Sequence, residues 1–259
     1  MRRGNLAHGF VQLKQLVSTV EKTLSKRVGV AMGTIVFELC AETMQACLAA
    51  RDGGADRIEL CSALSEEGLT PSHGLLQEAI VQSGLPVHGL VRPRGGDFVY
   101  SAAEIAVMEW DILHMRQLGV AGVVLGLLKS DGTVDVEGTR RMVELAKPLK
   151  VTFHRAFDVT PSLEDALEDV IATGCDRVLT SGGRSDAMQG VEVLARLVAQ
   201  AGDRIEVAVG GGLRLGNAAE LVLRTGASSF HGSLSWDRIP TADDVCSIVS
   251  ELRSVAGVR

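Results

Sequence analysis

The sequence predicts a closed parallel (β/α)8 barrel, the TIM-barrel fold, formed by a single domain. Eight short β-type runs, each followed by a helical pattern, occur within about 225 residues, which is the spacing of β-α units. No Gly-x-Gly-x-x-Gly motif follows the first run, which disfavours a doubly wound open sheet. The expected strands are residues 36–40, 57–61, 87–92, 123–127, 151–155, 177–181, 206–212 and 228–233.

Helix signals separate these strands as the barrel requires. Pro71 and Ser72 open the second helix, a Ser101–Glu104 capping box opens the third, and Thr241 caps the last. The repeat Gly-x-Asp-Arg at 54–57 and 174–177 is typical of helix-to-strand turns, for which we expect a purely structural role at the bottom of the barrel. The third helix is expected at 105–118, and the others at 43–51, 135–146, 160–172, 186–201 and 215–224.

Composition restricts the class of protein. A net charge of -6 argues against nucleic acid as a partner, because phosphate binding needs a basic surface. Mean hydropathy is +0.20, but no run approaches the ~20 apolar residues of a membrane span, so we expect a soluble globular protein. Five scattered cysteines without a CxxC motif predict reduced thiols and a cytoplasmic location.

Residues 1–31 differ in kind from the predicted barrel at 32–259. Six basic residues oppose one glutamate there, giving a local charge of +5, and apolar residues recur at helical spacing. Three interpretations remain open for this basic amphipathic extension. It is an over-extended start ahead of Met32, a helix packed on the barrel, or a targeting segment.

Two copies of Glu-Leu-Cys end the first two strands. Side chains alternate along a strand, so Glu38 shares a face with Cys40, and Glu59 shares one with Cys61. Because these strands are neighbours in a barrel, we expect both carboxylates and both thiols at similar heights. Two soft thiolates suit Cu(I) or zinc, although buried cysteines also serve as small apolar residues.

Charged residues at the other strand ends suggest acid-base chemistry. We expect Glu38, Glu59, Arg92 and His154 to form one cluster at the carboxyl-terminal mouth of the barrel. Carboxylates beside a guanidinium and an imidazole are the groups used in proton abstraction or isomerisation. The competing interpretation is a buried ion network that only holds the barrel together, which is a poor source of stability.

The last two strands indicate a separate anion site. Glycine runs let backbone amides approach an anion, and the loops after strands seven and eight form a recurrent phosphate site in this fold. The expected anion-binding residues are Arg94, Gly210, Gly211, Gly212 and His231.

Six longer motifs run in order along the predicted barrel: Phe37-Glu-Leu-Cys40, Asp56-Arg-Ile-Glu-Leu-Cys61, Gly68-Leu-Thr-Pro-Ser72, Arg92-Pro-Arg-Gly-Gly-Asp-Phe98, Phe153-His-Arg-Ala-Phe-Asp158 and Leu179-Thr-Ser-Gly182. With these motifs the sequence resembles, over residues 35–235, the CutC family of copper homeostasis proteins. One departure is Glu67, where a second glycine often precedes the Gly-Leu-Thr-Pro run, and it concerns the shape of the loop after strand two.

The resemblance implies a cytoplasmic, self-associating barrel that binds Cu(I) through Cys40 and Cys61. The main alternative is an enzyme acting on a small phosphorylated or anionic metabolite. In that case Glu38, Glu59 and His154 carry out acid-base chemistry, and Arg92 with the glycine loop binds the anion. The third interpretation is a barrel that serves as a scaffold and has no catalytic activity.

Overall fold

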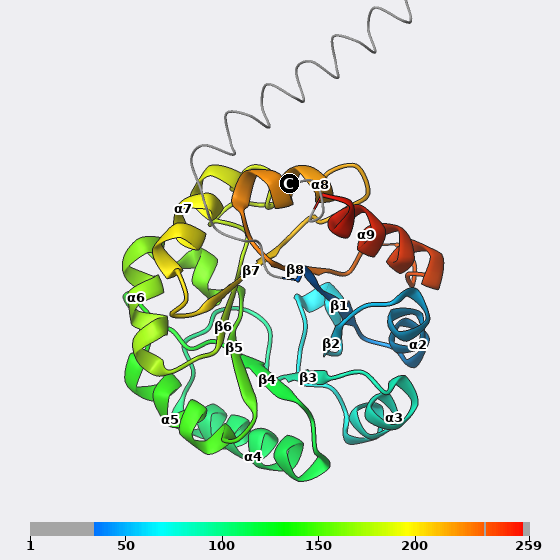
Figure 1. Cartoon of the computed structure of the whole chain (residues 1–259). Coiled ribbons are helices and arrows are strands. Elements are labelled where there is room, and N and C mark those ends of the chain that lie inside the picture. The colour runs from blue at the N-terminus through cyan, green and yellow to red at the C-terminus, as the bar shows by residue number, and fades with distance from the viewer. Residues whose placement is uncertain (1–33, 236, 256–259) are drawn as a thin grey trace, which may run out of the picture. The chain divides into compact units, whose positions relative to one another are not determined.

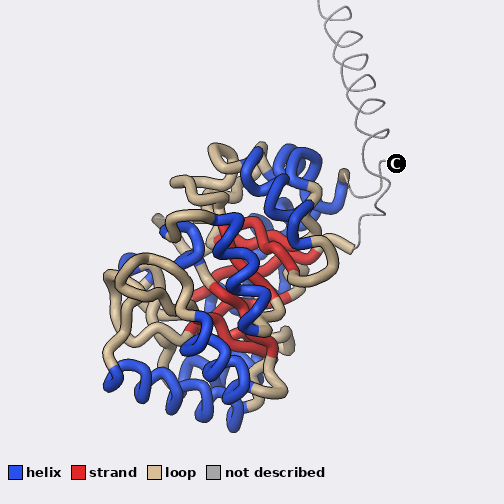
Figure 2. The backbone as a smooth tube through the Cα atoms, turned by 90° about the vertical axis from the view of Figure 1, so that its left-hand side faces the viewer, coloured by secondary structure: helices blue, strands red, loops and turns tan. Residues whose placement is uncertain are grey.

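The computed structural model describes residues 34–235 and 237–255, and eight parallel strands in that part close into a barrel. Hydrogen-bonded neighbours run β1 to β8 in sequence order, and β8 pairs with β1. Figure 1 shows the strands around a common centre with helices outside them, and Figure 2 shows the same arrangement from the side. The strands are β1 (Val36–Ala41), β2 (Arg57–Leu60), β3 (Val87–Leu90), β4 (Gly122–Leu125), β5 (Lys150–Phe153), β6 (Arg177–Thr180), β7 (Glu206–Gly210) and β8 (Ser229–Gly232).

Helices connect consecutive strands, and the last helix, α9, packs against α2 beside β1. The predicted (β/α)8 barrel is therefore confirmed. The predicted extension at 1–31 lies outside the described residues. No helix in the described part is long and apolar enough to cross a membrane. The α-helices are α2 (Met44–Gly53), α3 (His73–Ser83), α4 (Ala102–Leu118), α5 (Val136–Ala146), α6 (Leu163–Thr173), α7 (Val191–Ala201), α8 (Ala218–Thr225) and α9 (Ala242–Ser254); the 3-10 helices are η1 (Leu64–Glu66) and η2 (Arg155–Val159).

Local capping chemistry fixes where the helices begin. The Ser101 hydroxyl accepts a hydrogen bond from the Glu104 amide, and the Glu104 carboxylate accepts one from the Ser101 amide, so the predicted capping box is present. Helix α7 begins at Val191 rather than at residue 186. Asp186 instead accepts hydrogen bonds from the backbone and side chain of Gln189, which stabilises a turn ahead of the helix.

Strand β5 is shorter than the sequence predicts. It ends at Phe153, because the Nδ1 atom of His154 accepts a hydrogen bond from the Ala156 amide at 3.1 Å and opens η2. His154 and Arg155 therefore belong to the loop that follows the strand. Because they lie outside the strand, their side chains need not alternate between its two faces as the residues of β5 do.

The two faces of strand β1 carry different kinds of side chain. Phe37 and Leu39 on β1 are fully buried on the face opposite Glu38 and Cys40. Glu38 forms an ion pair with Arg177 on β6, which is not a neighbour of β1, so the contact crosses the barrel interior. Strand β1 thus points its charged and thiol side chains into the interior, and Phe37 and Leu39 lie on the opposite face.

Candidate functional site

The two cysteines of the repeated Glu-Leu-Cys motif meet inside the barrel. Their Sγ atoms are 3.9 Å apart, and the Cys61 thiol also donates to the Ala41 carbonyl at 3.6 Å. Both are buried in an apolar cluster with Leu90, Val124 and the partly buried Leu64. All five cysteines are free thiols, and Cys40 and Cys61 approach each other as the sequence predicts.

The register of β1 and β2 differs from the expected one. Cys40 lies opposite Glu59, and Glu38 lies opposite Arg57, so the two motifs are offset rather than level. Staggered strands are a requirement of barrel closure. The offset places the Glu59 carboxylate 3.9 Å from the Cys40 sulfur, while Cys61 lies farther toward the mouth.

A third strand brings His231 to the same place. One ligand atom each from Cys40, Glu59 and His231 lie within 4.8 Å of one another, and all three residues are buried. The Nδ1 atom of His231 lies 3.9 Å from Glu59 and 2.8 Å from Glu38. Among the described residues this is the one group of three or more side chains with metal-ligand spacing.

In the metal-free protein, Cys40 and His231 are both protonated, but the thiol is neutral and the imidazole carries a positive charge. The contact with Cys61 and burial raise the pKa of the Cys40 thiol well above its ordinary value, so it is protonated at neutral pH. Burial alone would lower the pKa of His231, but Glu59, Cys40 and Glu38 raise it well above its ordinary value. His231 is therefore an imidazolium paired with carboxylates.

Below the thiols lies a buried ion network centred on Glu38. Its carboxylate receives Arg177 at 2.5 Å, His231 at 2.8 Å and the Nε atom of Arg57 at 3.3 Å. Burial raises the pKa of Glu38, but these three cations outweigh it and hold that pKa well below its usual range. The neighbouring Glu59 has a raised pKa, caused by burial and then by the charge of Glu38 against the opposing effect of His231.

The remaining two members of the expected cluster lie elsewhere. Arg92 donates to the carbonyls of Glu66, Gly68 and Gly96, and its guanidinium lies over the Phe98 ring at 5.1 Å. In the described part of the chain it makes no hydrogen bond or ion pair with Glu38 or Glu59. The four residues therefore form no single hydrogen-bonded cluster in the described part of the chain, because backbone carbonyls after β2 and β3 bind the Arg92 guanidinium.

His154 lies beside Arg92 rather than beside the carboxylates. Its ring centroid is 5.0 Å from that of Phe98, and burial, together with the charge of Arg92, lowers its pKa to about 3. The imidazole is therefore neutral, and its Nδ1 atom is already used by the Ala156 amide. His154 shapes the start of η2 in this arrangement.

The expected anion-binding residues are also divided between two places. Arg94 forms ion pairs with Glu104 at 2.5 Å and Asp97 at 3.0 Å, so its charge is used within its own loop. Gly210 lies against His231, and Gly211 and Gly212 have positive φ angles of 94° and 74°. The glycine loop and His231 are thus adjacent, and Arg94 serves the loop after β3.

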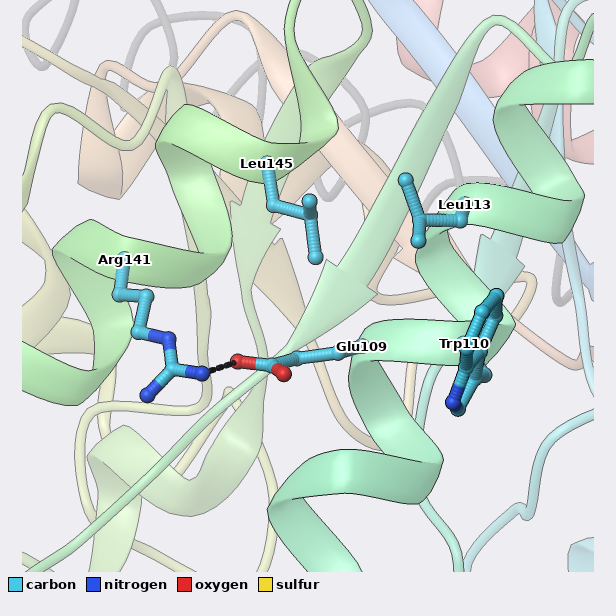
Figure 3. Close-up of a pocket in the computed structure, with 5 residues that line it drawn as sticks. All are labelled: Glu109, Trp110, Leu113, Arg141 and Leu145. Atoms are coloured by element: carbon cyan, nitrogen blue, oxygen red, sulfur yellow. Dashed lines mark ion pairs between the residues drawn. The ribbon is translucent and has the colours of Figure 1, made fainter.

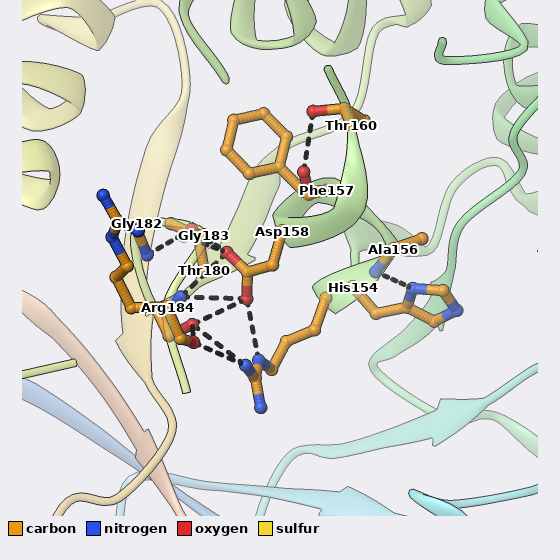
Figure 4. A network of polar contacts seen from close by, with 11 residues as sticks. His154, Ala156, Phe157, Asp158, Thr160, Thr180, Gly182, Gly183 and Arg184 are labelled. Atoms are coloured by element: carbon orange, nitrogen blue, oxygen red, sulfur yellow. Dashed lines mark hydrogen bonds and ion pairs between the residues drawn. The ribbon is translucent and has the colours of Figure 1, made fainter. Parts of the chain in front are cut away.

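A further network joins the loops after β5 and β6 (Figure 4). Asp158 accepts hydrogen bonds from the Thr180 hydroxyl, the Ser181 amide and the Gly183 amide, and it forms an ion pair with Arg155 at 2.8 Å. The guanidinium of Arg155 in turn lies beside Gly211. Asp158 thereby holds together the loops after β5 and β6 at the mouth.

One cavity lies outside the barrel (Figure 3). This cavity of about 360 Å³ between α4 and α5 is lined by Glu109, Trp110, Leu113, Arg141 and Leu145. Arg141 and Glu109 form an ion pair at 2.5 Å, and Trp110 is exposed. It contains none of the predicted site residues, so its size does not mark the candidate site.

Comparison with known proteins identifies the family. The CutC family model matches residues 35–236. The chain belongs to the CutC family. A CutC family protein of Chromobacterium violaceum is 50% identical over 198 residues, covering 76% of this chain and 80% of the relative. A CutC family protein of Caulobacter vibrioides is 46% identical over 209 residues, covering 81% and 84%.

A solved structure agrees with this assignment. The crystal structure of CutC from Streptococcus agalactiae, a protein named for copper homeostasis, has 33% sequence identity and a TM-score of 0.74. The match covers 78% of this chain and 99% of that one. The resemblance predicted from the motifs is therefore confirmed.

Two residues of the interior network, Arg57 and Arg177, are not among the predicted site residues. Both lie in the Gly-x-Asp-Arg repeat, to which we assigned a purely structural role at the bottom of the barrel. Each arginine is the first residue of its strand, and Arg57 shares a face with Glu59 and Cys61. That alternation was the available signal that these guanidiniums enter the interior.

Proposed function

We propose that the chain is a Cu(I)-binding protein of copper homeostasis, with the thiolates of Cys40 and Cys61 as its ligands. The observation that supports this most strongly is the sulfur separation of 3.9 Å inside an apolar cluster. A metal about 2.3 Å from each of two thiolates separates them by at most about 4.6 Å. The pair can therefore hold one ion without a large backbone movement.

The donor set favours a soft ion. Thiolates select Cu(I) or zinc, and the pair packs against apolar leucine and valine side chains, with the Glu59 carboxylate 3.9 Å from the Cys40 sulfur as the neighbouring oxygen donor. Binding must release the Cys40 proton, because its pKa is raised. His231 is suited to be a third ligand only after losing the proton that Glu38 and Glu59 stabilise, so the sulfurs form the core of the proposed site.

The family relation supports the biological role. The Streptococcus agalactiae relative carries copper homeostasis in its name, and this chain matches nearly all of it. Free thiols require a reducing compartment, so the proposal places the protein in the cytoplasm. Self-association stays a prediction of the family resemblance.

Competition with a Cu(I) chelator tests the proposal in reduced protein. We expect one tight site in wild type and a loss of about 100-fold or more in affinity when Cys40→Ser and Cys61→Ser are combined. Cys246→Ser is the matched control, because this thiol is exposed and lies on α9, and it should bind as wild type does. Equal binding by all three proteins would contradict the assignment.

A second candidate is an acid-base enzyme for a small anionic metabolite. The buried neighbours Glu59 and His231 favour it. The pKa of each is raised, which favours the neutral carboxylic acid for Glu59 and the charged imidazolium for His231. Such a pair can donate and accept a proton. Turnover that is abolished by Glu59→Gln and retained by Cys40→Ser/Cys61→Ser would favour this candidate over copper binding.

A further inference from the structure

A cavity of about 210 Å³ lies at the amino-terminal end of the barrel interior, opposite the thiol pair. Arg57, Lys150, Arg177 and Glu206, which line it, are the first residues of β2, β5, β6 and β7. His88 on β3 and Thr152 on β5 complete the wall together with Asp176. The volume is more than ten times what one water molecule needs, so a small polyatomic ion fits.

Two buried guanidinium groups in this cavity have hydrogen-bonding capacity left over. Arg177 is 2% exposed and donates from Nε to Thr152 at 3.0 Å and from Nη2 to Glu38 at 2.5 Å. Its Nη1 atom and the Nε atom of Arg57 are buried without a hydrogen-bond partner. Buried donors of this kind are rare and costly, which indicates that something else satisfies them.

Neither neighbouring carboxylate hydrogen-bonds these two donors. The Nε atom of Arg57 lies 3.3 Å from Glu38, an ion pair without a hydrogen bond, and Glu206 approaches Nη2 of Arg57 and Nη1 of Arg177. One oxygen of Glu206 lies 3.5 Å from Arg57 and 3.9 Å from Arg177, distances that give an ion pair but no hydrogen bond. The Glu206 side chain is 40% exposed, so it can leave the cavity. Asp176, by contrast, is held by Lys150 at 2.7 Å and by the Val151 amide at 2.9 Å.

The charges around the cavity favour an anion. Three cationic side chains line it against two carboxylates, and one of those carboxylates, Glu206, is partly exposed to solvent and makes no hydrogen bond to the arginines. His88 adds no charge, because burial lowers its pKa to about 4. With Glu206 displaced, Arg57, Arg177 and Lys150 line the cavity against Asp176 alone, and the unbonded Nη1 of Arg177 can donate to an oxyanion.

We propose that this cavity binds a small oxyanion of the phosphate or sulfate type between Arg57 and Arg177, in the place that the Glu206 carboxylate occupies loosely. The amino-terminal end of a TIM barrel usually serves stability alone, so a ligand site there is an addition to the copper site rather than part of it. The two sites share only Glu38, which Arg177 holds from below and His231 holds from above.

Inorganic phosphate is the probe, added to metal-free, reduced protein and followed by calorimetry and by the 31P line width. Glu206→Gln should bind phosphate about tenfold more tightly, because it removes a nearby negative charge, and Lys150→Gln should bind about tenfold more weakly. Both side chains are partly or mostly exposed, so both variants should fold. Glu144→Gln and Lys147→Gln, an exposed ion pair outside the cavity, are the matched controls and should bind as wild type does.

Phosphate binding that Glu206→Gln and Lys150→Gln leave unchanged would place the ion elsewhere and overturn the proposal. So would the absence of binding by both wild type and Glu206→Gln, which would leave a cavity filled by water. The Cys40→Ser/Cys61→Ser variant should bind phosphate like wild type. Failure of copper binding and failure of this proposal are therefore separate outcomes.

Discussion

The two ends of the barrel interior differ in the chemistry they offer. Strand β2 and the residue after it place Arg57, Glu59 and Cys61 on one face at successive heights, from the amino-terminal cavity to the mouth. The lower part is charged and incompletely hydrogen-bonded, whereas the thiols lie in an apolar cluster. The thiols thus lie toward the mouth and the arginines toward the amino-terminal end, with the carboxylates of Glu38 and Glu59 between them.

This separation has a physical basis in the stagger of the strands. Cys40 lies opposite Glu59, so the sulfurs are one pleat above the ion network that holds Glu38. A copper ion bound to the sulfurs would lie next to the imidazolium of His231 rather than next to the arginines. The ion network around Glu38 can then hold the strands together while Cys40 and Cys61 release protons and bind the metal.

Removing Arg177 tests most strongly whether the lower end supports the fold. Arg177→Met should destabilise the protein by about 3–5 kcal/mol, because it leaves the buried Glu38 carboxylate without its closest cation. Urea denaturation measures the change. Arg196→Met removes an exposed ion pair with Glu164 and is the control, for which we expect little change. Equal stability of the two variants would show that the ion network contributes nothing specific.

The pH dependence of Cu(I) affinity sharpens the description of the upper end. Metal competes with the Cys40 proton at every pH below the raised pKa of that thiol. Affinity should therefore rise with pH through the neutral range, by up to about tenfold per pH unit for each proton released. Competition titrations at several pH values measure the slope. An affinity independent of pH would mean that Cys40 is not a ligand.

The barrel was predictable because its signals are local and repeated. Glycine turns at Gly54, Gly119 and Gly174 precede strands, and capping residues such as Ser101 mark the helices. The ends of strands were less predictable. The boundary at Phe153 depends on one side-chain hydrogen bond from the Ala156 amide to His154, which no periodicity reveals.

The candidate site was predictable where strand alternation controls it. Cys40, Cys61, Glu38 and Glu59 lie in or directly after strands, and the sequence places them in the interior. Arg92 was not predictable, because its position depends on three backbone carbonyls in a loop and on the Phe98 ring. The interior position of Arg57 and Arg177 was not predicted, because both belong to the Gly-x-Asp-Arg repeat, which we interpreted as a helix-to-strand turn.

X-ray absorption at the copper edge of Cu(I)-loaded protein tests the central claim most directly. The account predicts two sulfur neighbours for each copper, supplied by the buried pair of Cys40 and Cys61, and their loss in the Cys40→Ser/Cys61→Ser variant. A copper environment made of nitrogen and oxygen alone, or one that is unchanged in the variant, would contradict it.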